Sequence, residues 1–163
     1  MKAPIILTNV QQEAAHCVLN GIATGHLVVL RGAAGSGKTT VLERVRNERG
    51  GLLLGARQFV GAAKSMTPAA IEDAFLRMME EAIVVHELVL ADDLQILLNF
   101  VEIHSYERRY LLDASLTALV GQAGLQGCKL VFAVEDEAPW PIRRRALVAE
   151  ISNEGRELAA AVG

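Results

Sequence analysis

The chain has 163 residues, of which 52% are hydrophobic and 21% are charged, so it is long and apolar enough to fold around a substantial core. Its formal net charge of −3 gives no support for non-specific binding of nucleic acid, which requires a basic surface. Neither a secretory signal nor an apolar stretch of membrane-spanning length is visible, and we therefore expect a cytoplasmic protein without membrane contact.

Apolar runs of strand length alternate with segments of helical period along the chain. Thr8 and Gln11 have the spacing of a capping box, which predicts the start of a first helix that Gly21 and Gly25 close. The further elements that we expect, in chain order, are a strand at 26–31, a helix at 38–49, a strand at 52–54, a helix that Thr67 caps and that runs to Ala82, a strand at 88–91, helical faces at 94–101 and 112–120, a strand at 129–134 and a fifth strand at 146–151. Buried strands that alternate with helices predict a three-layer α/β/α sandwich around a mainly parallel five-stranded sheet.

The two cysteines, Cys17 and Cys128, lie far apart and lack the spacing of a metal-binding pair. Cys17 falls on the apolar face that we expect for the first helix. Both cysteines are predicted to be reduced residues of the core.

The strongest local signal is a glycine-rich segment that begins where the strand at 26–31 ends. Residues Gly32–Thr39 (GAAGSGKT) match the P-loop pattern G-x-x-x-x-G-K-[ST]. The glycines allow a tight turn whose backbone N–H groups can surround a phosphate, and the Lys38 ammonium neutralises phosphate charge. The Thr39 hydroxyl is a predicted magnesium ligand, and the helix that begins there directs its positive end at the phosphates. We therefore predict that ATP or GTP is bound, with Mg²⁺, by Gly32, Ala33, Ala34, Gly35, Ser36, Gly37, Lys38, Thr39 and Thr40.

Two acidic residues follow the apolar strand at 88–91. Asp92 and Asp93 come directly after it, and a P-loop enzyme needs a carboxylate at the tip of a neighbouring strand to hold the magnesium shell. We predict that Asp92 serves the metal together with Thr39. Asp93 stands where many ATPases carry a glutamate that polarises the attacking water, so Asp93 and Lys38 are the predicted catalytic residues of this part of the site.

With these motifs in this order, residues 27–151 resemble the large α/β subdomain of the AAA+ ATPases, which have the P-loop NTPase fold. The resemblance implies a homo-oligomeric ring in which ATP hydrolysis with Mg²⁺ drives the remodelling of a protein or nucleic-acid substrate. Phe59-Val60-Gly61, after the second expected strand, resembles the pore loop that grips polypeptides in that family. Arg143, Arg144 and Arg145 fall where the family keeps its arginine fingers, so the resemblance implies that they act catalytically on the ATP of the next subunit.

The sequence also departs from the pattern of that family. The family usually has Asp-Glu where this chain has Asp92-Asp93, and a polar sensor after the fourth strand where this chain has Glu135-Asp136-Glu137. A shorter carboxylate and three acids near a triphosphate predict slow hydrolysis. We expect residues 1–163 to form a single P-loop domain that lacks the family's C-terminal helical lid. Residues 155–163 are expected to begin a helix that the sequence does not complete, as in a fragment of a longer protein.

Other functions stay open on the same residues. A small-molecule kinase is compatible with the chain length, and Arg143 to Arg145 would then clamp a substrate phosphate. A superfamily-one helicase fragment is a second alternative, because Leu7-Thr8-x-x-Gln11 resembles the adenine-reading glutamine motif of those enzymes. Residues 136–142 resemble their Gly-Asp-x-x-Gln segment, although the glycine and the glutamine are missing. A nucleotide-binding domain that has lost catalysis and serves assembly is the third alternative.

Overall fold

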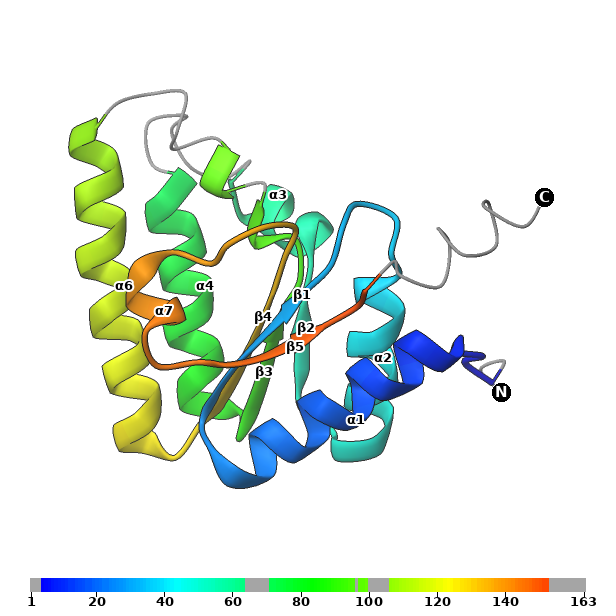
Figure 1. Ribbon diagram of the computed structural model, residues 1–163. Coiled ribbons are helices and arrows are strands. Elements are labelled where there is room, and N and C mark those ends of the chain that lie inside the picture. The colour runs from blue at the N-terminus through cyan, green and yellow to red at the C-terminus, as the bar shows by residue number, and fades with distance from the viewer. Residues whose placement is uncertain (1–3, 64–70, 96, 100–105, 153–163) are drawn as a thin grey trace.

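The computed structural model describes residues 4–63, 71–95, 97–99 and 106–152. They form a three-layer α/β/α sandwich, in which helices cover both faces of one sheet (Figure 1). The elements are α1 (Asn9–Thr24), β1 (Leu27–Arg31), α2 (Lys38–Arg49), β2 (Leu52–Leu54), α3 (Ala56–Ala63), α4 (Ile71–Val85), β3 (Leu88–Ala91), α6 (Tyr106–Gln126), β4 (Lys129–Val134), α7 (Trp140–Arg143) and β5 (Leu147–Glu150). The predicted fold class is confirmed, and the sheet is parallel throughout.

The five strands lie in the order β2-β3-β4-β1-β5. β4 therefore separates β1, which precedes the glycine-rich loop, from β3, which precedes the acidic pair. The register pairs Arg31 with Val134 and Ala91 with Phe132, so β1, β4 and β3 end at the same edge of the sheet. Ligands of open parallel sheets bind outside the carboxyl ends of the strands, and here the loops after three strands meet at that edge.

The continuous apolar run of β1 follows from burial on both faces of the sheet. Val28 and Leu30 belong to a cluster that includes buried residues of α1 and α2. Leu27 and Val29 belong to a second cluster, which includes buried residues of α4 and α6. Successive side chains of a strand point to opposite faces, so a strand covered on both sides is apolar at every position.

The predicted capping box starts α1. The Thr8 hydroxyl accepts a hydrogen bond from the Gln11 N–H at 3.3 Å, and the Thr8 N–H donates to Gln11 Oε1 at 3.0 Å. The prediction that Gly21 helps to close the helix is wrong, because Gly21 lies inside α1 and Gly25 alone is the C-cap. A Cβ at position 21 would lie 2.7 Å from a methyl carbon of Val28, so Gly21 allows α1 to pack closely on β1.

The cysteines differ in their surroundings. Cys128 is buried, as predicted, and burial raises the pKa of its thiol. Cys17 is exposed, so its assignment to the core is wrong. The buried residues of α1 are Ala14, Ala15, Val18, Gly21 and Ile22. Packing on the sheet fixed the rotation of the helix, and position 17 fell outside the buried face.

Several expected features lie outside the described residues, namely the cap at Thr67, the helical position at 101 and the final segment 155–163. The helix expected at 112–120 is longer and forms α6. Residues 94–95 and 97–99 are helical, as expected from their apolar spacing. In the part of the chain that the structure describes, no helix combines the length and the apolarity needed to cross a membrane.

Candidate functional site

The loop between β1 and α2 turns at the carboxyl edge of the sheet. The Gly32 N–H donates to the carbonyl oxygen of Val134 at 3.1 Å, which anchors the start of the loop to β4. Gly35 and Gly37 have φ values of 74° and 91°, in the left-handed region that residues with a side chain rarely adopt. The glycines at these two positions of the motif are therefore required by the turn itself.

The start of α2 is open towards this edge. Gly37 is the N-cap, and no side chain caps the helix. The first hydrogen bond within the helix runs from the Val41 N–H to the Gly37 carbonyl at 3.1 Å, so the preceding N–H groups of Lys38, Thr39 and Thr40 have no acceptor in the helix. An uncapped helix start carries partial positive charge and presents N–H donors, which fits a bound phosphate.

The Lys38 ammonium lies across the loop. Its Nζ donates to the carbonyl oxygens of Gly32 at 2.6 Å and Ala33 at 3.0 Å. Arg31, one residue before the loop, forms an ion pair of 2.8 Å with Glu150 on β5. The Arg31 charge is therefore compensated at the neighbouring strand, and Lys38 supplies the positive charge of the loop.

The metal pair predicted from the sequence is in direct contact. The Thr39 hydroxyl donates to Asp92 Oδ2 at 2.5 Å, and the Asp92 N–H donates to the Leu54 carbonyl at 2.7 Å, which holds the residue at the end of the β2–β3 pairing. Asp92 is only 8% exposed. Burial raises the pKa of its carboxyl group, and the hydrogen bond from Thr39 opposes that rise in part. A hydroxyl and a carboxylate side by side are oxygen ligands of the kind that Mg²⁺ prefers, so these residues fit a magnesium ion beside a phosphate.

Asp93 takes an unusual backbone conformation beside this pair. It is the only non-glycine residue with a positive φ, 57°, among the residues that the structure describes. Its N–H donates to Asp92 Oδ1 at 3.0 Å, and its own Oδ2 accepts the N–H of Ala56 at 3.3 Å. The carboxylate predicted to polarise water is therefore held at the start of α3. Strained conformations of this kind are typical of functional sites.

A cavity of about 270 Å³ lies between the loop and the ends of β3 and β4, and we call it the loop cavity. It is lined by Ala34, Gly35, Gly37, Lys38, Thr39, Asp92, Asp93, Gln95, Ala133, Val134 and Glu135. The structure thus brings the glycine-rich loop and the acidic pair together. Among the described residues of this lining, Lys38 is the only cation, and three are carboxylates. Gln95 was missed by sequence reasoning, and its place three residues after Asp92 was the only available signal.

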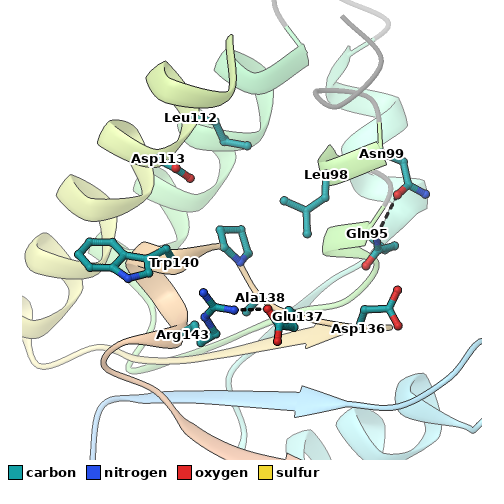
Figure 2. Close-up of a pocket in the computed structure, with 11 residues that line it drawn as sticks. Gln95, Leu98, Asn99, Leu112, Asp113, Asp136, Glu137, Ala138, Trp140 and Arg143 are labelled. Atoms are coloured by element: carbon teal, nitrogen blue, oxygen red, sulfur yellow. Dashed lines mark hydrogen bonds and ion pairs between the residues drawn. The ribbon is translucent and has the colours of Figure 1, made fainter. Parts of the chain in front are cut away.

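The three arginines predicted as arginine fingers do not line the loop cavity. Arg143, in α7, forms an ion pair with Glu137 and lines a second cavity of about 460 Å³ (Figure 2). The Arg144 guanidinium lies 4.6 Å from the ring centroid of Trp140. Arg145 is exposed, and its guanidinium has no hydrogen bond or ion pair with another described residue. Within one chain, the arginines are therefore not brought together with the glycine-rich loop.

The segment predicted as a pore loop is helical. Phe59-Val60-Gly61 lies in α3, and Phe59 is 8% exposed. Its ring packs edge-on against Phe75 of α4, with ring centroids 6.0 Å apart. The prediction of an aromatic grip at Phe59 is wrong in this structure, because the hydrophobic core between α3 and α4 takes up the ring.

Gln11 reaches the glycine-rich loop from α1. Its Nε2 donates to the Ser36 carbonyl at 3.0 Å, while its Oε1 accepts the Thr8 N–H. A Cβ at Gly37 would collide with this amide. Both ends of the Gln11 amide are thus engaged in the protein. An adenine-reading role, as in the helicase alternative, would require the amide to leave these contacts.

No protein-family model and no curated protein sequence matches the chain. Solved structures do match it. A DNA replication initiation factor matches with a TM-score of 0.57 at 18% identity, over 96% of this chain and 51% of that one. The replication initiator DnaA bound to AMPPCP and single-stranded DNA matches with a TM-score of 0.54 at 18% identity, over 91% of this chain and 48% of that one. AMPPCP-bound DnaA from Aquifex aeolicus matches with a TM-score of 0.55 at 18% identity, over 90% and 48%. The chain therefore spans about half the length of these proteins, and at this identity the likeness establishes the fold.

Proposed function

We propose that this chain, whose fold is that of the α/β subdomain of the AAA+ ATPases, binds ATP with Mg²⁺ at the glycine-rich loop. The observation that carries the proposal is the 2.5 Å hydrogen bond between Thr39 and Asp92, beside the uncapped start of α2. It joins the two predicted magnesium-binding side chains from separate elements at the point where phosphate-binding N–H groups converge. The DnaA structures with this fold hold the ATP analogue AMPPCP, which supports a nucleotide as the ligand.

Separate residues would hold each part of the ligand. The N–H groups at the start of α2 would donate to phosphate oxygens, and the Lys38 ammonium would exchange its carbonyl acceptors for phosphate. The Thr39 hydroxyl would ligate Mg²⁺, and the Asp92 carboxylate would hold the water shell of the ion. The bound ion would supply neutralisation of phosphate charge. A cation there also explains why a buried carboxylate whose pKa is raised is kept at the end of β3.

We also propose that the chain hydrolyses the bound ATP, and we expect this reaction to be slow. Asp93 lines the loop cavity but its carboxylate accepts the N–H of Ala56. To orient a water molecule it must share or leave that hydrogen bond, and its side chain is one methylene shorter than glutamate. Glu135 adds a further negative charge at the same wall, which opposes charge building up on phosphate oxygens.

An arginine from a second subunit would increase this slow rate of ATP hydrolysis. Arg143 is paired with Glu137 and Arg144 stacks on Trp140, whereas Arg145 is exposed and has no described partner. An arginine finger must be free to enter the site of a neighbouring subunit. We therefore assign the trans-acting role, among the three predicted arginines, to Arg145 in a homo-oligomer.

We propose nucleic acid as the class of macromolecule on which such a ring acts. A DnaA structure with this fold is bound to single-stranded DNA, which supports nucleic acid as the substrate of such a ring. The buried ring of Phe59 leaves the polypeptide alternative without a gripping side chain at that position.

Calorimetric titration with Mg²⁺ and ATP tests the proposal. Lys38→Ala removes the only cation among the described residues of the loop cavity, so ATP binding should fall at least about a hundredfold while the folded state persists. Arg49→Ala removes the same charge at the opposite end of α2 and should bind as the parent does. Equal ATP affinity of Lys38→Ala and the parent would sink the assignment. A parent that binds ATP without releasing phosphate in any oligomer would favour the assembly domain over the ATPase.

A further inference from the structure

Gln95 lies between two cavities. It lines the loop cavity together with Lys38, Thr39 and Asp92, and it also lines the second cavity beside Asn99. Figure 2 shows its side chain at the rim of the second cavity, with the amide joined to Asn99. Its neighbour Leu94 is 1% exposed, so the segment that carries Gln95 is packed into the core.

Two hydrogen bonds set the orientation of the Gln95 amide. The Glu135 N–H donates to Gln95 Oε1 at 3.4 Å. Because a backbone N–H can only donate, the oxygen of the amide must face Glu135, at the end of β4. Gln95 Nε2 donates to Asn99 Oδ1 at 2.9 Å. An amide nitrogen has two hydrogens, so this bond uses one of them and leaves the second for another acceptor.

The side chains that line the loop cavity divide by charge and by hydrogen-bonding type. On the side formed by the loop and α2, Lys38 and Thr39 are donors. On the facing side, Asp92, Asp93 and Glu135 are carboxylates, which only accept when ionised. Of the described residues on that facing side, Gln95 alone has a side-chain donor. A diphosphate can be held by the loop side alone, whereas an additional phosphate extends towards the carboxylates of the facing side, where a hydrogen-bond donor next to the proposed Mg²⁺ would stabilise it.

We propose that Gln95 is the specificity-determining residue that lets this site distinguish a nucleoside triphosphate from a diphosphate. The second hydrogen of its Nε2 donates to an oxygen of the terminal phosphate, and its bonds to Glu135 and Asn99 hold the amide ready for that contact. This inference rests on the proposed function and names the residue that reads the third phosphate.

Two variants separate this role from a purely structural one. Gln95→Met keeps the side-chain length but removes both the donor and the acceptor. Gln95→Glu keeps an acceptor for the Glu135 N–H, replaces the donor by an oxygen and adds a negative charge. If Gln95 only holds the end of β4, Gln95→Glu is the milder change. If Gln95 donates to the terminal phosphate, Gln95→Glu is the more severe change, and it is severe for the triphosphate alone.

The measurement is the pair of dissociation constants for ADP and for a non-hydrolysable ATP analogue with Mg²⁺, with thermal unfolding of each variant as a check on folding. We expect the analogue to bind about tenfold more weakly to Gln95→Met and weaker still to Gln95→Glu, with ADP within about threefold of the parent. Gln126→Glu makes the same chemical change at the far end of α6 and should leave both constants unchanged.

The possible failures are distinguishable. A parent that binds neither nucleotide would overturn the proposed function itself. A parent that binds both, with an unchanged ratio of the two constants in Gln95→Met and Gln95→Glu, would overturn the role of Gln95 alone. That outcome includes equal weakening of both nucleotides in both variants, which would show that Gln95 merely shapes the site.

Discussion

Thr39 on α2 and Asp92 after β3 are 53 positions apart in sequence, yet the hydroxyl of one donates to the carboxylate of the other at 2.5 Å. This hydrogen bond crosses the carboxyl edge of the sheet, where β4 lies between the strands that carry the two motifs. It places a buried carboxyl group beside the start of a helix whose first N–H groups have no acceptor within the helix. Substitutions that change the charge of this pair therefore test the proposed site.

Asp92→Asn should weaken magnesium-dependent ATP binding and spare metal-free binding. The asparagine keeps the shape of the side chain, and Thr39 can accept a hydrogen bond from its amide, but the charge that holds the metal's water shell is lost. We expect a loss of at least about tenfold in affinity with Mg²⁺, measured by calorimetry with and without EDTA. Equal loss under the two conditions would mean that Asp92 is structural.

Asp92→Asn should also change how the free energy of unfolding depends on pH in the absence of nucleotide and metal. Burial raises the folded-state pKa of Asp92 above its unfolded value of about 4. The stabilising contribution is therefore complete below the unfolded pKa, and it is lost as the pH rises through the folded pKa. At neutral pH, Asp92→Asn should therefore be more stable than the parent. Urea unfolding at a series of pH values measures this difference, which must shrink on acidification; a difference that grows would contradict the assignment.

Asp93→Glu should raise the rate of phosphate release several-fold, because the longer carboxylate reaches past the contact with Ala56. It should also lower stability by up to about 1 kcal/mol, since glutamate tolerates a φ of 57° less well than aspartate does. Asp93→Asn is the matched control: it retains an acceptor for the Ala56 N–H and should abolish turnover. A rate that is unchanged in Asp93→Glu would remove Asp93 from catalysis.

Phe59→Ala should act through stability. The ring is buried against Phe75, and its removal should cost about 3 kcal/mol of unfolding free energy. Val60→Ala, in the same helix but at a residue 46% exposed, should change stability by less than about 0.5 kcal/mol. Chemical denaturation of both variants checks this. Full stability of Phe59→Ala, combined with loss of a macromolecular substrate, would restore the gripping role.

Arg145 of one chain should support ATP hydrolysis at the glycine-rich loop of a neighbouring chain. A mixture of Lys38→Ala chains with Arg145→Ala chains should regain part of the parental ATPase rate, because some neighbours then combine an intact loop with an intact finger. A finger supplied by a neighbour contributes up to about a thousandfold or more in rate. Phosphate release is the readout, and it is measured where light scattering shows that the parent assembles.

Arg144→Ala is the control for that mixture. Its guanidinium stacks on Trp140 of the same chain, so the variant should keep most of the parental rate by itself. A mixture that stays inactive while the parent assembles and hydrolyses ATP would end the trans-acting assignment of Arg145.

The features that the sequence by itself determined are local ones. The capping box of Thr8 and Gln11, the glycine-rich turn and the acidic end of β3 each depend on residues within a few positions of one another. Buried parallel strands are apolar at every position, so their continuous runs predicted the α/β sandwich. The P-loop pattern, which requires a carboxylate at the tip of a neighbouring strand, predicted that the acidic pair would lie beside the glycine-rich loop. These features could be predicted because backbone geometry and the period of burial depend directly on the order of the residues.

Tertiary structure alone decided the partners of Gln11 and Gln95. Gln11 is 25 positions from Ser36, and Gln95 is 40 positions from Glu135, so no local spacing relates the partners. Their contacts depend on the strand order, which puts β4 between β1 and β3. The burial of Phe59 likewise depends on how the helices rotate when they pack on the sheet. Packing selects one such arrangement from the many that an apolar pattern permits, because only the complete core determines which faces remain to be covered.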